Sequence, residues 1–144
     1  MLPQTLNTNE VKDAAGVEVE FVRLEQDGRT VTFAKSGEAP DSPLRLSVKH
    51  QESGFGAAKR RRSVVRVDLT SQPGDGGVSA NASLPARTSM YLVADLPVGV
   101  LADVTGPTDA LAYLMSFVAS TGATTTILYN GTGNGANALL TGGL

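Results

Sequence analysis

Alternation of apolar and polar residues is the feature that most constrains the fold of this chain. In residues 44–51, LRLSVKHQ, the apolar side chains Leu44, Leu46 and Val48 lie on one side of an extended chain, and polar or charged ones lie on the other. This period of two is typical of β-strands. The pattern recurs, with some drift, in residues 17–24, 29–35, 62–69 and 87–98. The sequence therefore predicts strands with one apolar and one polar face.

Turn and loop signals separate these predicted strands. Asp27-Gly28 is a strong hairpin signal, and residues 36–43, SGEAPDSP, have the composition of turns. Residues 52–58, ESGFGAA, predict a flexible glycine loop. The longest loop, residues 71–86, consists mainly of glycine, proline and small polar residues, and loops of this length are usually functional or disordered.

Positive charge is concentrated in one short window. The formal net charge is -2, yet residues 45–66 hold seven bases and one acid. If residues 44–51 and 62–69 pair as antiparallel strands, the cations of both share one face of the sheet. These cations are Arg45, Lys49, Arg62 and Arg66. Such a face either is a solvated surface that keeps the protein soluble or binds a polyanion.

An aromatic residue accompanies the cations. Tyr91 lies on the polar side of strand 87–98. Arg and Lys contacts to phosphates, combined with bases stacked on a ring, are a common mode of RNA binding. Alternatively, Tyr91 only covers the sheet surface and keeps its hydroxyl in water.

Residues 105–120, TGPTDALAYLMSFVAS, predict a helix that is apolar nearly all round. Pro107 suits the first turn, and Asp109 is favourable near the positive end of the helix dipole. A single sheet cannot bury all sides of such a helix, so we expect a symmetric dimer. The expected interface residues are Leu111, Tyr113, Leu114, Met115, Phe117 and Val118. Residues 124–130 are ambiguous between helix and strand, and we expect part of the glycine-rich tail to be mobile unless a neighbour holds it.

Groups that could support catalysis are few. The chain has no cysteine, and its single histidine, His50, falls on the apolar side of its strand, where we expect an edge-of-core residue. No motif for a hydrolase, a kinase or a dinucleotide binder is present. The sequence therefore argues against an enzyme, a metal site and a cofactor. No secretory leader or membrane-spanning run is recognisable, and we expect a soluble, intracellular protein with no membrane partner.

The order of these elements resembles one known family. SPLRLSVKHQ, a polar loop, KRRRSVVRVDL, a glycine-rich loop ending in Leu84-Pro85, SMYLVADLPV and TGPTDALAYLMSFVAS follow one another as in the coat proteins of single-stranded RNA bacteriophages, the leviviruses. The preceding TVTFAKSGEAPDSP is also similar to the family. The resemblance covers roughly residues 17–120 and rests on order and spacing.

The resemblance implies a single α+β domain over residues 1–144. Residues 1–35 would form an N-terminal β-hairpin and the first strand of a five-stranded antiparallel sheet. Residues 44–98 would supply its RNA-facing strands, and residues 105–144 two helices and a tail. The helices cross over the partner, so that the interlocked homodimer has a continuous ten-stranded sheet. Dimers of the family form an icosahedral shell around genomic RNA, and many repress replicase translation by binding an RNA hairpin. The protein would be found in the virion, assembled in the bacterial cytoplasm.

The family's functional positions map onto the polar face. The resemblance places RNA contacts at Arg45, Ser47, Lys49, Arg62, Val64, Arg66, Tyr91 and Asp95. We expect Lys59, Arg60 and Arg61, at the end of a loop, to bind phosphates without regard to sequence. Residues 71–86 match the loop around the symmetry axes of the shell, where Gly74, Gly76, Gly77 and Pro85 would permit several conformations. The leading alternative is a cellular RNA-binding dimer that does not assemble; the other is an enzyme with its site between subunits.

Overall fold

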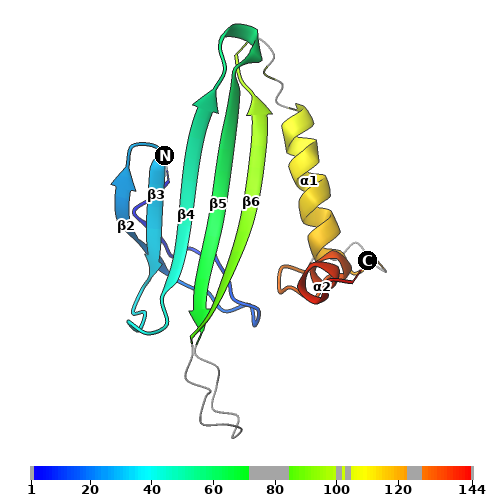
Figure 1. Cartoon of the computed structure of the whole chain (residues 1–144). Helices are drawn as coiled ribbons and strands as arrows, with labels where there is room; N and C mark the ends of the chain where they lie inside the picture. Colours follow the sequence, from blue (N-terminus) through cyan, green and yellow to red (C-terminus); the bar gives the residue numbers. More distant parts are fainter. Residues whose placement is uncertain (1, 72–84, 100–101, 103–104, 123–127, 144) are drawn as a thin grey trace, which may run out of the picture.

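The protein forms one six-stranded antiparallel sheet and two helices (Figure 1). The computed structural model describes residues 2–71, 85–99, 102, 105–122 and 128–143. The strands follow one another across the sheet in chain order, from β1 to β6. Their bounds are Thr5–Leu6 (β1), Phe21–Asp27 (β2), Thr30–Lys35 (β3), Leu44–Ser53 (β4), Arg60–Ser71 (β5) and Ala86–Pro97 (β6). A 3-10 turn, η1 (Gly56–Ala58), separates β4 from β5, and the helices are α1 (Thr105–Ala119) and α2 (Asn134–Thr141).

Most of the predicted strands are confirmed. β4 and β5 contain the alternating stretches 44–51 and 62–69 and extend by two residues beyond them at one end or at both. β6 covers the predicted stretch 87–98 except for its last residue, and begins one residue earlier. β2 starts at Phe21 instead of residue 17, because the preceding residues form a separate turn. The turn between β2 and β3 contains Gly28 at φ +53°, as the Asp27-Gly28 signal predicts.

The prediction of five strands is wrong by one strand. β1 pairs with β2 through Thr5↔Val22 and Leu6↔Phe21 and so adds a sixth, very short strand. Leu6 is buried against Phe21 and Phe33, and burial of this side chain holds β1 in place. The N-terminal hairpin is reduced to one bridge, Lys12↔Glu18.

The core of the described chain is small and lies at one side of the sheet. Phe21 and Phe33, on β2 and β3, are almost completely buried. Partly buried residues of the N-terminal segment, β3 and β4 pack around them. None of the described residues of β4, β5 and β6 is fully buried. The apolar face of these three strands therefore lacks a complete cover within one chain.

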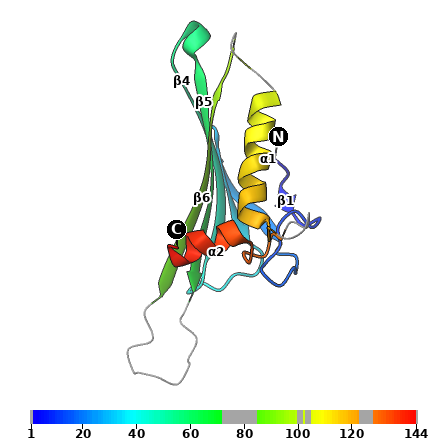
Figure 2. The same cartoon turned by 90° about the vertical axis from the view of Figure 1, so that its right-hand side faces the viewer.

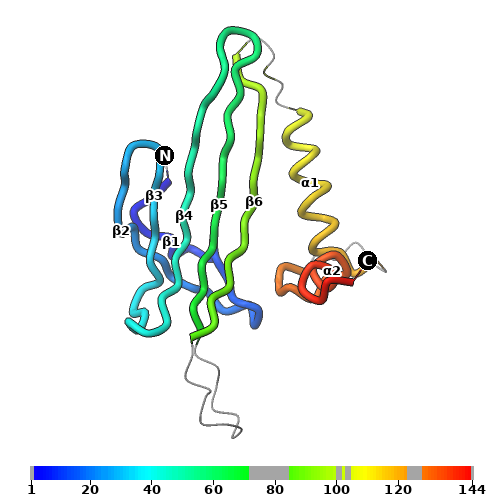
Figure 3. The backbone as a smooth tube through the Cα atoms, in the orientation of Figure 1, coloured from blue at the N-terminus to red at the C-terminus, as the bar shows by residue number. Residues whose placement is uncertain are grey.

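Helix α1 lies beside the edge strand β6 rather than across the sheet of its own chain (Figures 1 and 2). It starts near the end of β6 and runs toward the opposite end of the sheet, where α2 follows (Figure 3). The helix predicted at residues 105–120 is confirmed. Helix α2 forms in the tail, for which the residue pattern alone predicted no structure.

Two glycines allow α2 to approach α1 closely. A Cβ atom at Gly133 would collide with the carbonyl oxygen of Val118, and one at Gly135 with that of Phe117. Only glycine permits this backbone approach. The two helices therefore form one compact unit at the end of the sheet.

Candidate nucleic-acid interface

The polar face of the sheet is organised in cross-strand rows. Ser47 on β4 lies opposite Arg66 on β5, which lies opposite Tyr91 on β6. Because directly opposed residues point to the same face, these side chains are neighbours. The prediction that cations of β4 and β5 share a face with Tyr91 is confirmed, and the register of β6 is fixed. Parallel rows carry Arg45–Asp68–Ser89, Lys49–Val64–Val93 and Gln51–Arg62–Asp95.

Arg66 contacts both an aromatic ring and a carboxylate of this face. Its guanidinium lies 5.1 Å from the centroid of the Tyr91 ring. Asp68 holds it in two-point fashion, with Nε 2.6 Å from Oδ2 and Nη2 donating to Oδ1 at 2.7 Å. These bonds leave donors of the five-donor guanidinium free for another partner. Arg66, Ser47 and Tyr91 thus form a polar and aromatic site of fixed geometry.

Asp68 links three side chains of the same face. Its carboxylate accepts the hydrogen bonds of Arg66 and one from the Ser89 hydroxyl at 2.5 Å. Its Oδ1 also lies 3.5 Å from Nη2 of Arg87, which forms an ion pair with it. The hydrogen bonds from Arg66 and then from Ser89 hold the pKa of Asp68 below its usual value. The carboxylate is therefore ionised at neutral pH and compensates part of the positive charge counted in the sequence.

Carboxylates of the protein also bind other arginines of the face. Arg45 is bonded to Glu38, and Arg60 Nε lies 3.0 Å from Asp95 Oδ1. Within the part of the chain that the structure describes, Lys49 and Arg62 form no ion pair, and both are exposed. The polar face thus carries arginines that are paired with carboxylates and two cations that are not. Of these two, Lys49 lies near the centre of the face and Arg62 nearer the β4–β5 end.

The run Lys59–Arg62 is divided between the two faces of the sheet. Arg60 and Arg61 belong to β5, so their expected location in a loop is wrong. Arg61 lies opposite Glu52, on the face away from Arg62. Since side chains alternate along a strand, four consecutive cations cannot all reach one surface.

Glu52 forms ion pairs with the cations of that second face. Its carboxylate lies 2.7 Å from Lys59 Nζ, 3.1 Å from Arg61 Nη2 and 3.1 Å from Arg29 Nη1. These partners, Lys59 first, lower the pKa of Glu52 to about 2. Lys59 and Arg61 therefore stabilise the β4–β5 end of the sheet, a role for which the run of cations gave no signal.

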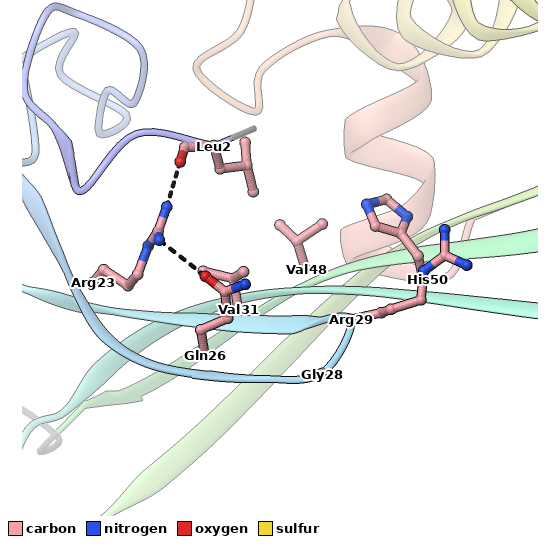
Figure 4. Close-up of a pocket in the computed structure, with 8 residues that line it drawn as sticks. All are labelled: Leu2, Arg23, Gln26, Gly28, Arg29, Val31, Val48 and His50. Atoms are coloured by element: carbon pink, nitrogen blue, oxygen red, sulfur yellow. Dashed lines mark hydrogen bonds between the residues drawn. The ribbon is translucent and has the colours of Figure 1, made fainter.

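His50 lies on the apolar face of β4, as predicted, but it is exposed in the single chain. Its Nδ1 is 2.8 Å from the Ser63 hydroxyl. It lines a cavity of about 220 Å³ together with Arg23, Val31 and Val48 (Figure 4). Arg23 is held there by the carbonyl oxygens of Leu2 and Pro3.

The described residues contain no candidate for a metal site or for a helix that spans a membrane. Across residues 2–71 and the later described segments, no three His, Asp or Glu side chains come together as a metal site would require. Neither described helix has the length and apolar character needed to cross a membrane.

The expected dimer surface is exposed in the single chain. Tyr113, Phe117 and Leu111 of α1 are 72%, 61% and 48% exposed, and β6 pairs only with β5 among the described strands. These apolar side chains therefore have no complete cover among the described residues of one chain.

The expected assembly loop lies mostly outside the described residues. Gly74, Gly76 and Gly77 fall within residues 72–84, which the structure does not describe. Pro85 is exposed immediately before β6.

Solved structures with a similar fold are a bacteriophage coat protein, that of EMS014, and bacteriophage virus-like particles. The chain matches the virus-like particle of bacteriophage EMS014 with a TM-score of 0.64 and 12% identity, over 88% of each chain. It matches the virus-like particle of bacteriophage AVE015 with a TM-score of 0.56 and 16% identity, over 86% of this chain and 80% of the other. For the particle of bacteriophage ESE058 the TM-score is 0.52 and the identity 16%, over 78% and 89%.

Because the sequence identities are low, these matches show the fold alone. No protein-family model matches the sequence, and no curated protein matches it significantly. The chain therefore has the fold of bacteriophage coat proteins, which the order of its sequence motifs also indicated.

Proposed function

We propose that the protein is the coat protein of a single-stranded RNA bacteriophage, which dimerises, assembles into an icosahedral shell and encloses its genome against the polar face of the sheet. The observation that carries this proposal is the cross-strand register. It gathers Ser47, Arg66 and Tyr91 beside the free cations Lys49 and Arg62 on a single face. The opposite face and α1 carry the apolar surface that a partner would cover, and the solved proteins of this fold form virus-like particles.

Dimerisation through β6 and α1 accounts for the uncovered surface. If the β6 strands of two copies pair antiparallel, β2–β6 of each copy make ten long strands, and the short β1 lies at each outer edge. Because α1 lies beyond β6, it would cover the apolar face of the second copy. The outer edge of the twelve-residue strand β6 pairs with no other described strand, and such an edge exposes backbone donors and acceptors that favour pairing.

RNA binding would divide into two kinds of contact. Lys49 and Arg62 are free to bind phosphates without breaking an ion pair. Arg66 keeps free donors and lies against Tyr91, so this pair with Ser47 could bind an unpaired base by stacking and hydrogen bonding. The same site could bind a hairpin of the genome and repress translation of the replicase. Sequencing RNA crosslinked to Tyr91 would test this, and random recovered sequences would contradict hairpin recognition.

Electron microscopy of the purified protein tests the main proposal. We expect closed particles that contain RNA protected from nuclease. Dimers that bind RNA but never form particles would instead support a cellular RNA-binding protein, the leading alternative. Intact particles without RNA would contradict the role of the polar face.

Substitution of one free cation tests that role directly. Lys49→Glu should reduce protected RNA per particle and lower the dependence of RNA affinity on salt, because each lost phosphate contact to a single strand changes the logarithmic slope by about 0.7. Lys35→Glu is the matched control, since Lys35 is exposed at the end of β3 on the other face. Equal RNA content in both variants would show that the face has been misidentified.

A further inference from the structure

Phe55 is the most exposed large apolar residue of the described chain. It lies between β4 and η1, and its side chain is 93% exposed. Aromatic side chains are enriched at protein interfaces, and an exposed ring is accessible for stacking on a base.

The loop that presents Phe55 is tightly held. The amide of Ala58 donates to the Phe55 carbonyl at 3.2 Å, and the amide of Val98 donates to the Lys59 carbonyl at 2.9 Å. Gly54 has φ +83°, and a Cβ atom there would lie 2.8 Å from the Ala58 carbonyl oxygen. The Glu52 cluster fixes the base of the same loop. The ring is therefore displayed by a defined backbone, which limits the entropy lost when a partner binds.

The surroundings of Phe55 favour RNA as that partner. The last pair of the β4–β5 ladder is Ser53↔Arg60, so Phe55 follows two residues beyond a row that carries an arginine of the polar face. Arg62, one of the two free cations, lies two residues after Arg60 on β5, which is about 7 Å along the strand. This end of the sheet curves away from α1, so the helix of the same chain does not cover it (Figure 2).

We propose that Phe55 is a stacking platform for an unpaired base of single-stranded RNA, with Arg62 and, farther along the sheet, Lys49 binding phosphates of the same RNA strand. A ring beside cations is the arrangement that binds single strands with little regard to sequence. The platform would extend the interface beyond the row of Ser47, Arg66 and Tyr91, toward the β4–β5 end. This inference rests on the proposed RNA-binding function of the polar face.

A tryptophan in place of Phe55 gives a direct measurement. The chain contains no tryptophan, so Phe55→Trp places one fluorescent reporter at the loop. We expect a single-stranded oligouridylate to quench its fluorescence, and an RNA duplex of equal length to quench it much less. Assembly in the absence of RNA should leave the fluorescence unchanged. Quenching on assembly alone would show that Phe55 contacts another protein copy and would overturn the proposal.

Affinity measurements separate this inference from the proposed function. Phe55→Leu should weaken oligouridylate binding about five-fold to 150-fold, the range for loss of one base–ring stack, and Phe55→Tyr should bind like the parent. If Lys49→Glu weakens binding but Phe55→Leu does not, the stacking platform is wrong and the RNA-binding face stands. If neither substitution weakens binding, the proposed function itself fails.

Discussion

At the scale of single residues, the structure separates cations that are free from cations that the protein itself neutralises. Arg45, Arg60 and Arg66 are each bonded to a carboxylate, whereas Lys49 and Arg62 are not. Counting charges in the sequence could not make this distinction, because it depends on which side chains the register brings together. If the polar face binds RNA as we propose, non-specific attraction would depend on fewer groups than the sequence indicates.

Glu52 provides a prediction about pH. Its pKa in the folded protein is about 2, against 4.5 for an ordinary glutamate, so its contribution to stability is complete above pH 4.5 and is lost as the pH falls toward 2. Glu52→Gln should therefore be less stable than the parent at neutral pH, and the difference should shrink over that acidic range. Denaturant unfolding at several pH values measures it.

The control for this prediction is Glu20→Gln, which removes the same charge from an exposed position outside the cluster. A difference between Glu52→Gln and the parent that stays constant down to pH 2 would contradict the ion-pair cluster.

At the scale of elements, the proposed dimer accounts for the exposed apolar surface of α1. Phe117→Ala should destabilise the dimer by about 3 kcal/mol, the value for removing a phenylalanine ring from a packed core, if a second copy covers this helix. In an isolated chain the ring is 61% exposed, and the substitution would cost much less. Equilibrium unfolding measures the change.

Phe55→Ala is the matched control, because it removes the same ring from a position that we assign to RNA contact rather than to the dimer. We expect its effect on stability without RNA to stay within about 0.5 kcal/mol. Equal effects of the two substitutions would argue against α1 as the dimer interface.

Elements with a strong local pattern were predictable from the sequence. β4, β5, β6 and α1 follow from periodicity, because their residues alternate or recur regardless of distant contacts. β1 and α2 were not predictable from the residue pattern. β1 is held by burial of Leu6 against Phe21 and Phe33, and α2 depends on the close approach of Gly133 and Gly135 to α1.

At the scale of the whole molecule, folding and association should be coupled. One chain buries only a small core and leaves the apolar face of β4–β6 incompletely covered. We expect the midpoint of denaturant unfolding to rise with protein concentration, since a tenfold increase stabilises a dimer by about 1.4 kcal/mol relative to unfolded chains. Midpoints that do not depend on concentration would indicate a stable monomer and contradict the dimer.

The sequence by itself determined the strand pattern, the segregation of cations onto one window and the apolar character of α1, because these properties depend on residues near one another in the chain. Only the tertiary structure decided which cations are free, which face Lys59 and Arg61 reach, and how Phe55 is presented. Those features arise from pairing between distant segments: one row of the β4–β5 ladder places Arg61 beside Glu52, and the next directs Arg62 to the opposite face. No local pattern specifies the partner that a charged side chain will meet.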